Sequence, residues 1–288
     1  MNNSGLVLLG VLALLLAGFS FVFVKDYGAH KEQLEPETNF VTSGIIGMVV
    51  NFFDTLGIGS FAPTTALLRT FKQIDDRVLP GTLNVACTIP VIVEAFAFIR
   101  AVEVEPITLT SMLVAASVGS YFGAGFMSKL PKATVQRVMA VALGLAGLVM
   151  LFQMLGIFPG GGEAIGLTGV ALVIGVVGNL ILGALMTAGV GLYAPCMALV
   201  YLLGMSPAVA FPIMMGSCAY LMPICSVKFI KEGAYNRKAS MAITIFGVVG
   251  VLIAVFLVTS LPLTVLKWLV VCVIAYTSIS MFKASKTA

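Results

Sequence analysis

Long apolar stretches separated by short polar loops run through the whole chain. A run of about 18 or more apolar residues is long enough for one helix to cross a hydrocarbon layer of about 30 Å. We therefore predict full-length membrane helices at residues 4–24, 81–102, 107–128, 134–158, 165–186, 210–229, 239–260 and 263–281. Three further apolar stretches, at residues 40–53, 61–71 and 193–203, are short for a crossing.

A glycine-rich break that ends in proline interrupts this pattern twice, 132 residues apart. It reads Thr-Leu-Gly-Ile-Gly-Ser-Phe-Ala-Pro at residues 55–63 and Thr-Ala-Gly-Val-Gly-Leu-Tyr-Ala-Pro at residues 187–195. Over residues 55–67 and 187–199 the same residue stands at seven matched positions, which are Thr55 and Thr187, Gly57 and Gly189, Gly59 and Gly191, Ala62 and Ala194, Pro63 and Pro195, Ala66 and Ala198, and Leu67 and Leu199. Pro80 and Pro212 keep the same offset.

The repeated break predicts a duplicated chain with a broken helix at the same place in each copy, which is typical of secondary transporters. We assign the first copy to residues 40–158 and the second to residues 159–288. Residues 1–39 form an additional N-terminal transmembrane helix and a polar cytoplasmic loop. Each broken pair could be a re-entrant hairpin or two true crossings. The predicted fold class is an all-α polytopic membrane protein.

Composition supports a protein whose solvent is the lipid bilayer. The chain is 60% hydrophobic and only 10% charged, against about a quarter charged in soluble domains. Its sixteen Lys and Arg residues are too few for a nucleic-acid surface. The five cysteines lie in apolar segments without the paired spacing of a metal site or a disulfide framework, and the single histidine, His30, lies in a polar loop. We predict no cofactor, no metal and no catalytic residue, so the protein is not expected to be an enzyme.

The distribution of basic residues predicts which way the chain crosses the membrane. Lys and Arg in short loops favour the cytoplasmic side. With the N-terminus outside and the C-terminus in the cytoplasm, only Arg100 and Lys267 of the sixteen basic residues fall outside. Each copy then contributes an odd number of crossings. The two copies are therefore predicted to have inverted topology, with the first broken pair entering from the cytoplasm and the second from outside.

The breaks are the predicted binding site for a small anion. Proline suits the first turn of a helix, so helices should begin near Phe61 and Tyr193 and direct their N-termini to the centre of the membrane. Helix N-termini bind anions through unpaired N–H groups and a partial positive charge. The candidate substrate-binding residues are Asn51, Thr55, Gly57, Gly59, Ser60, Phe61, Thr64, Asn84, Asn179, Thr187, Gly189, Gly191, Tyr193 and Cys196. The alternative interpretation is that the glycines serve only close packing of helices, but the duplication of the whole block with proline in register disfavours it.

Two acidic residues, Asp54 and Glu94, lie within apolar segments and are candidates for proton coupling. Their counterparts at the 132-residue offset are Met186 and Ser226, so neither acid is duplicated. Asp54 could instead cap backbone amides in the break, and Glu94 could form an ordinary helix–helix hydrogen bond. Arg69 could draw anions to the inner mouth, but extension of its side chain toward the headgroups is the preferred interpretation.

The chain resembles the TauE/SafE family of sulfite exporters, within the toluene-sulfonate uptake permease group. The resemblance rests on the Gly-x-Gly breaks and on the Gly-Met-Ser-Pro-Ala-Val-Ala stretch at residues 204–210, and it covers about residues 40–282. Ser60 and Leu192 stand where the family's turn often has a third glycine. The resemblance implies proton-coupled transport of sulfite, a sulfonate such as sulfoacetate, or a related organic anion across the bacterial inner membrane.

Other interpretations stay open at this point. An anion channel could use the same helix N-termini as a selectivity filter. A membrane enzyme is disfavoured because no cluster of His, Cys or acidic residues has catalytic spacing, and a sensor is disfavoured because no soluble domain is evident. The expected partners are the anionic substrate, protons and the lipid bilayer, and homodimer formation is left open.

Overall fold

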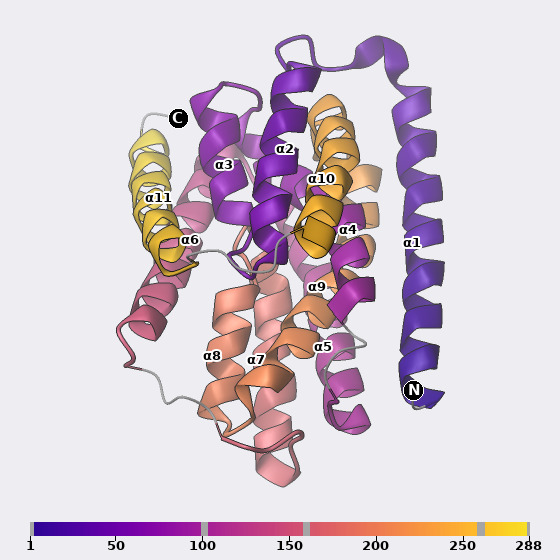
Figure 1. The fold of residues 1–288 in the computed structure, drawn as a ribbon. Helices are drawn as coiled ribbons and strands as arrows, with labels where there is room; N and C mark the ends of the chain where they lie inside the picture. Colours follow the sequence, from indigo (N-terminus) through magenta and orange to yellow (C-terminus); the bar gives the residue numbers. More distant parts are fainter. Residues whose placement is uncertain (1–2, 99–102, 158–161, 258–262, 287–288) are drawn as a thin grey trace.

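Helices make up nearly all of the regular structure in the computed structural model, which describes residues 3–98, 103–157, 162–257 and 263–286 (Figure 1). The helices are α1 (Asn3–Ala29), α2 (Phe40–Thr55), α3 (Phe61–Thr70), α4 (Leu79–Phe98), α5 (Pro106–Met127), α6 (Lys132–Met154), α7 (Gly169–Met186), α8 (Tyr193–Leu202), α9 (Pro207–Lys231), α10 (Arg237–Leu257) and α11 (Leu263–Ala284). Two short 3-10 helices, η1 (Lys31–Gln33) and η2 (Asp76–Val78), lie in loops. The all-helical prediction is confirmed.

Most predicted helices agree with the observed ones, and the differences have local causes. Helix α1 continues to Ala29. Helix α7 begins only at Gly169 because the segment before it is tied to other loops, with Ser206 N donating to Ala164 O at 2.8 Å and Glu105 N to Ile165 O at 2.9 Å. The predicted helix ends at residues 102, 158 and 260 lie outside the described residues.

The two broken segments form hairpins that approach each other from opposite ends of the molecule (Figure 1). Helix α2 runs from the upper end to the middle and α3 returns to the upper end, while α7 rises from the lower end and α8 returns to it. The ten-residue helices α3 and α8 thus begin near the middle of the molecule. Each pair is thus a helical hairpin, and whether it is re-entrant or crosses the membrane fully stays a prediction.

Helices α4 and α9 form the buried centre, and the other helices pack around them. Helix α10 packs on α2, α5 packs on α7, and α6 packs on α11. Glycines allow close approach at two of these contacts. A Cβ at Gly47 would overlap the Ile243 backbone of α10, and a Cβ at Gly183 would overlap the Ala116 carbonyl of α5. Small residues with this role are frequent in membrane helices.

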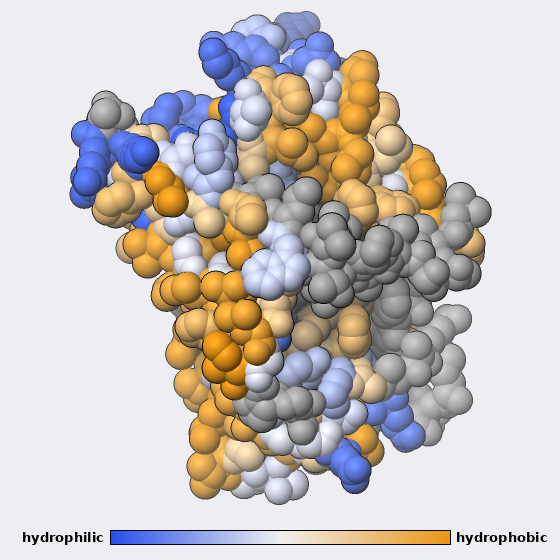
Figure 2. Space-filling model, turned by 60° about the vertical axis from the view of Figure 1, so that its left-hand side comes forward, coloured by the Kyte–Doolittle hydropathy of each residue, from blue (hydrophilic) through white to orange (hydrophobic). Residues whose placement is uncertain are grey.

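Seven helices among the described residues are long and apolar enough to cross a membrane. In the most apolar stretches of α4 and α9, 83% of the residues are buried, whereas in those of α1 and α7 only 22% are. Among the coloured residues in Figure 2, apolar ones dominate the middle of the molecule, and hydrophilic ones gather at its upper end and, in smaller number, at its lower end. The protein is therefore a multi-pass membrane protein with a buried central helix pair.

Candidate functional site

The two breaks share a backbone conformation that glycine makes accessible. Gly57 and Gly189 have φ angles of 84° and 86°, in the left-handed region. Gly57 N donates to Asp54 O at 2.7 Å, and Gly189 N donates to Met186 O at 3.0 Å, so the hydrogen bonds also match at the 132-residue offset. Gly59 has a third left-handed angle, 88°, that is not repeated at Gly191.

A small cavity of about 40 Å³ lies between the first turns of the two half-helices. From the first break it is lined by Gly59, Phe61 and Ala62, and from the second by Gly191, Tyr193 and Ala194. Ile58 of the first break and residues of α6 and α11 supply the rest of the lining, which is apolar. This volume is enough for about three water molecules. Matched positions of the two breaks therefore converge on one small cavity.

The first residues of both half-helices line this space and have backbone N–H groups without an acceptor among the described residues. The first N–H groups of any helix have no acceptor within that helix. Pro63 and Pro195 are the third residues of α3 and α8 and bring no N–H. The N–H groups of Phe61, Ala62, Tyr193 and Ala194 form no hydrogen bond within the described residues. Two helix N-termini thus present unpaired donors at the same cavity.

Glu94 of α4 connects the two breaks through hydrogen bonds. Thr55 Oγ1, at the end of α2, donates to Glu94 Oε1 at 3.0 Å, and the Tyr193 hydroxyl, at the start of α8, donates to Glu94 Oε2 at 3.1 Å. All three residues are buried. Glu94 makes the kind of helix–helix hydrogen bonds that its structural interpretation predicted, but its partners come from both breaks.

Asp54 is bound to the start of α3. Ser60 Oγ donates to Asp54 Oδ2 at 2.9 Å, and the Ser60 backbone N–H also points to this carboxyl group. The Asp54 side chain is buried, and its charge and that of Glu94 act on each other. Asp54 therefore contacts the start of α3 and Glu94 contacts Tyr193, which lines the cavity, while neither acid is itself a lining residue.

Three of the other predicted polar residues bond to the backbone of their own helix or of the turn beside it. Thr64 donates to Ser60 O, Thr187 to Ala184 O and Asn51 to Gly47 O, so these side chains serve the helices that flank the breaks. Asn51 Oδ1 has no hydrogen-bond partner among the described residues, and Cys196 is buried one turn into α8.

Asn84 and Asn179 contact other helices. Asn84 bonds Pro80 O and accepts from the Cys225 thiol of α9. Asn179 donates to Met112 O of α5 and Ser217 Oγ of α9, at 2.8 Å each. None of the residues that line the cavity contacts either side chain through a hydrogen bond, so these two are not brought to it.

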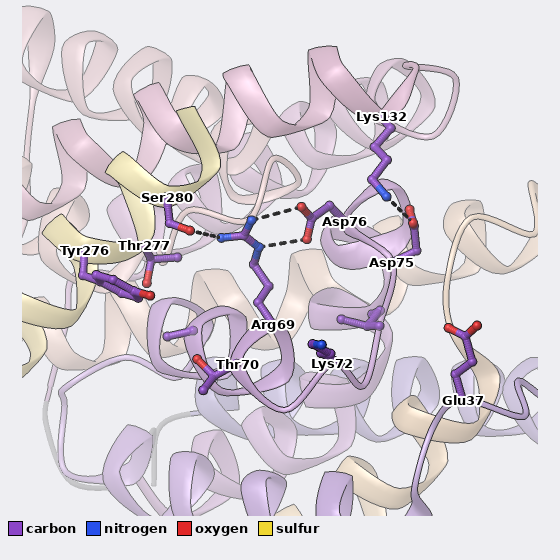
Figure 3. Close-up of a pocket in the computed structure, with 12 residues that line it drawn as sticks. Glu37, Arg69, Thr70, Lys72, Asp75, Asp76, Lys132, Tyr276, Thr277 and Ser280 are labelled. Carbon is purple, nitrogen blue, oxygen red and sulfur yellow. Dashed lines mark hydrogen bonds and ion pairs between the residues drawn. The ribbon is translucent and has the colours of Figure 1, made fainter. Parts of the chain in front are cut away.

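Two larger hollows lie at the far ends of α3 and α8. The Arg69 vestibule, of about 380 Å³, is a polar hollow that includes Arg69, Lys72, Asp75, Asp76, Lys132 and Ser280 (Figure 3). The Trp268 vestibule, of about 340 Å³, includes Gln153, Tyr201 and Trp268. The Trp268 vestibule shares Ile58, Met150 and Ala194 with the central cavity, so these two spaces adjoin.

The preferred interpretation of Arg69 was wrong. Its side chain is 17% exposed and pairs with Asp76 through Nε at 2.9 Å, so it does not extend toward the headgroups. Sequence reasoning missed this pair because the partner lies beyond a turn whose path was unknown. The charged run at residues 69–77 was the only signal that could have pointed to it.

Long apolar helices together with two helical hairpins that meet at a small cavity define a polytopic α-helical membrane protein. The family model described as "TauE: Sulfite exporter TauE/SafE" matches residues 2–150, more than half of the chain. The chain therefore belongs to the TauE/SafE family of sulfite exporter-type transporters. The match includes α1 and ends before the second hairpin. No curated protein and no solved structure matches the chain.

Proposed function

We propose that this protein is a secondary transporter that moves a small anion across the bacterial inner membrane by alternating access, coupled to protons. Sulfite, a sulfonate such as sulfoacetate, or a related organic anion is the proposed substrate. The observation that carries the proposal is the cavity between α3 and α8, at which both helix N-termini present unpaired N–H groups. Such donors bind oxyanions without a full cation nearby.

The proposed architecture is a pair of inverted repeats, residues 40–158 and 159–288, preceded by the N-terminal unit of residues 1–39. Reciprocal packing supports it. At the 132-residue offset α2 corresponds to α7, and the pairing of α2 with α10 is matched by that of α7 with α5. The contact of α3 with α11 is likewise matched by that of α8 with α6. A two-fold relation between the copies accounts for these exchanges, and it lets the halves swap conformations to open either face.

The proposed orientation puts the N-terminus outside and the Arg69 vestibule on the cytoplasmic side. Its support is the gathering of basic residues at the upper end of the molecule in Figure 1, where the loops after α1, α3, α5 and α9 lie. Basic loops favour the cytoplasm.

Proton coupling is proposed because two carboxyl groups lie beside the anion cavity. An anion there is repelled by an ionised Asp54 or Glu94, so a bound proton favours anion binding, and by linkage the anion favours the proton. The hydrogen bonds allow a protonated Glu94. Thr55 Oγ1 lies 2.9 Å from Asn51 O and 3.0 Å from Glu94 Oε1, but its one hydrogen can serve only one acceptor at a time. A protonated Glu94 could donate to Thr55 while Thr55 donates to Asn51.

Flux into proteoliposomes tests the proposal. Sulfite, sulfoacetate and a small carboxylate should be compared with and without a pH gradient, in the wild type and in Asp54→Asn and Glu94→Gln. We expect saturable sulfite or sulfonate flux that the gradient drives, and flux without gradient dependence in at least one variant. The matched control is Glu32→Gln, which removes an exposed carboxylate in η1 that lines none of the described cavities. Gradient-driven flux unchanged in both variants would exclude these groups from coupling, and flux that does not saturate would favour the alternative, an anion channel.

A further inference from the structure

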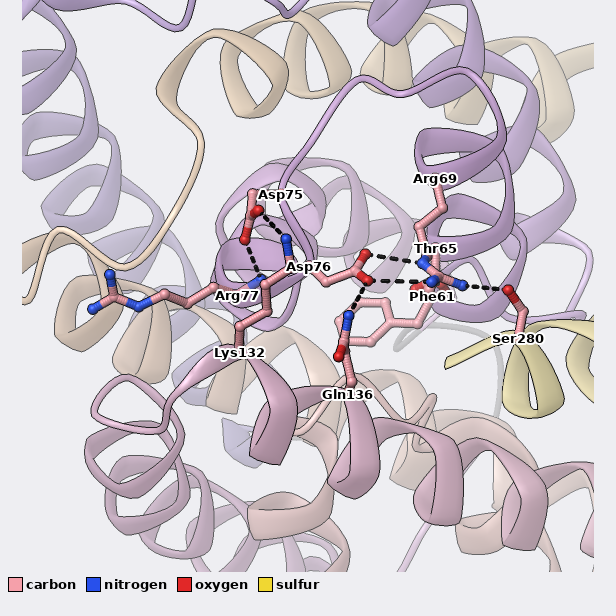
Figure 4. A network of polar contacts seen from close by, with 9 residues as sticks. All are labelled: Phe61, Thr65, Arg69, Asp75, Asp76, Arg77, Lys132, Gln136 and Ser280. Atoms are coloured by element: carbon pink, nitrogen blue, oxygen red, sulfur yellow. Dashed lines mark hydrogen bonds and ion pairs between the residues drawn. The ribbon is translucent and has the colours of Figure 1, made fainter. Parts of the chain in front are cut away.

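We propose that the Arg69 vestibule is a second anion-binding site, at which an oxyanion replaces the Asp76 carboxylate on Arg69 before it reaches the central cavity. The inference rests on the proposed function, since it takes the transported anion as the ligand. Figure 4 shows the network that carries it, in which the guanidinium of Arg69 lies between Asp76 and Ser280.

Arg69 holds Asp76 in the geometry by which a guanidinium recognises an oxyanion. Nε donates to Oδ1 at 2.9 Å and Nη2 to Oδ2 at 3.2 Å, while Nη1 donates to Ser280 Oγ at 3.0 Å. Two parallel N–H groups fit any group that offers two oxygens on one atom, such as a sulfite, sulfonate or carboxylate. Asp76 is thus an internal stand-in for the transported anion.

Asp76 keeps other partners when it leaves Arg69. Gln136 Nε2 donates to Asp76 Oδ2 at 2.7 Å from the buried side. Lys132 also acts on the Asp76 charge, although its ion pair is with Asp75, whose side chain is 53% exposed. An exposed pair of this kind contributes little, so Lys132 is available to Asp76. Asp75 keeps the Arg77 backbone N–H at 2.8 Å, so the exchange of an arriving anion for Asp76 leaves no carboxylate without a partner.

Lys72 adds a cation to the vestibule in a backbone conformation that favours glycine. Its φ of 52° makes it the only non-glycine among the described residues with a positive angle. The same turn at the end of α8 has Gly204, with φ of 77°, at the 132-residue offset. Gln73 N donates to Leu68 O at 2.8 Å in the first turn, as Met205 N does to Val200 O at 3.1 Å in the second. A lysine at this position is strained, and it forms no ion pair with any described residue.

The opposite vestibule has the same backbone without these cations. Tyr201 stands where the first copy has Arg69, and it lines the Trp268 vestibule. The residues described as lining that vestibule include no charged side chain. Anion capture by a guanidinium and a lysine is therefore confined to one end of the molecule, so the two faces should differ in apparent affinity for the anion.

Transport kinetics measured separately from each face test the site. Full-length protein in oriented proteoliposomes is assayed for sulfite flux, with sulfite added at the Arg69 face or at the opposite face. Arg69→Gln should raise the KM at the Arg69 face about tenfold and leave the KM at the opposite face unchanged. Lys72→Gly should raise the same KM severalfold while raising the melting temperature, because it relieves the left-handed lysine. Tyr201→Phe is the matched control and should change neither KM.

A charge swap separates anion binding from a purely structural ion pair. Arg69→Asp combined with Asp76→Arg should recover the melting temperature that Arg69→Gln loses, without recovering the KM at the Arg69 face. Recovery of that KM by the swap would overturn the proposal, as would an equal rise at both faces in Arg69→Gln.

Direct binding distinguishes failure of this site from failure of the proposed function. Gly191→Leu should fill the central cavity, since no atom lies within 4 Å of a Cβ there and the residue lines that cavity. Calorimetry with sulfite on Gly191→Leu should still detect one binding event, which Arg69→Gln should remove. If Gly191→Leu binds no sulfite while the wild type does, the vestibule site is overturned and the central site is supported. Binding in Gly191→Leu without flux in the wild type overturns the transport proposal alone.

Discussion

The Tyr193 hydroxyl donates to Glu94 Oε2 at 3.1 Å, across 99 residues of sequence, and so joins the second break to a carboxyl group of the first copy. Because Thr55 binds the other oxygen of the same carboxyl group, one side chain is shared between the two hairpins. A change in the protonation of Glu94 therefore alters hydrogen bonds at the end of α2 and at the start of α8.

Tyr193→Phe should lower the thermal stability of the purified protein. The variant keeps the ring but leaves Glu94 Oε2 with one partner fewer in a buried site, which costs about 1–3 kcal/mol. We expect a lower melting temperature in detergent. Tyr201→Phe, which breaks no hydrogen bond within the described residues, serves as the control. Equal melting temperatures for wild type and Tyr193→Phe would show that this bond does not hold the hairpins together.

Gly57→Ala and Gly189→Ala should both destabilise the protein, with the larger effect at Gly189. Left-handed backbone costs a residue with a Cβ roughly 1–2 kcal/mol. At Gly57 the nearest atom to such a Cβ is 3.7 Å away, whereas at Gly189 the Met139 methyl lies at 2.5 Å and must move. The melting temperature should therefore be highest for the wild type, lower for Gly57→Ala and lowest for Gly189→Ala.

Gly28→Ala is the control for that series, because Gly28 lies in α1 with no heavy atom within 4 Å of a Cβ. Alanine is favoured over glycine in a helix, so this variant should be at least as stable as the wild type. If Gly28→Ala lowered the melting temperature as much as Gly57→Ala does, the loss of stability at the breaks could not be assigned to left-handed backbone.

Trp268 should report which face its vestibule opens to. It is the single tryptophan of the chain, and its side chain is 43% exposed. In vesicles whose outer face matches that of the cell, iodide added outside should quench its fluorescence, and iodide trapped inside should not. Trp268→Phe supplies the background. Quenching from inside only would reverse the proposed orientation.

Stability should depend on pH through Glu105, which caps α5. The Thr108 and Ile107 backbone N–H groups donate to its carboxylate at 2.6 and 3.0 Å and hold its pKa below the ordinary value. A lowered folded pKa means that the stabilisation is complete above the unfolded pKa of about 4.3 and is lost as the pH falls through the folded value. The difference in melting temperature between wild type and Glu105→Gln should therefore be largest near neutral pH and shrink in acid. A constant difference would show that the charge of Glu105 does not contribute.

Helix positions were largely predictable from sequence, and the contacts among helices were not. Apolar runs indicate where the backbone can cross lipid, because backbone groups there must pair within their own helix. The residues of α2, α3 and α8 were therefore predicted within two positions of the observed ends. The start of α7 was missed, because it depends on hydrogen bonds to a distant loop at Ser206.

The sequence by itself determined that the chain is a helical membrane protein with two glycine breaks, since hydrophobicity and left-handed backbone are properties of local residues. Only the tertiary structure decided which side chains meet. It brought Glu94 to Thr55 and Tyr193, directed Arg69 to Asp76 and Ser280, and sent Asn84 and Asn179 to other helices. These contacts join segments far apart in the chain, and they depend on how each helix is rotated against its neighbours, which no local pattern specifies.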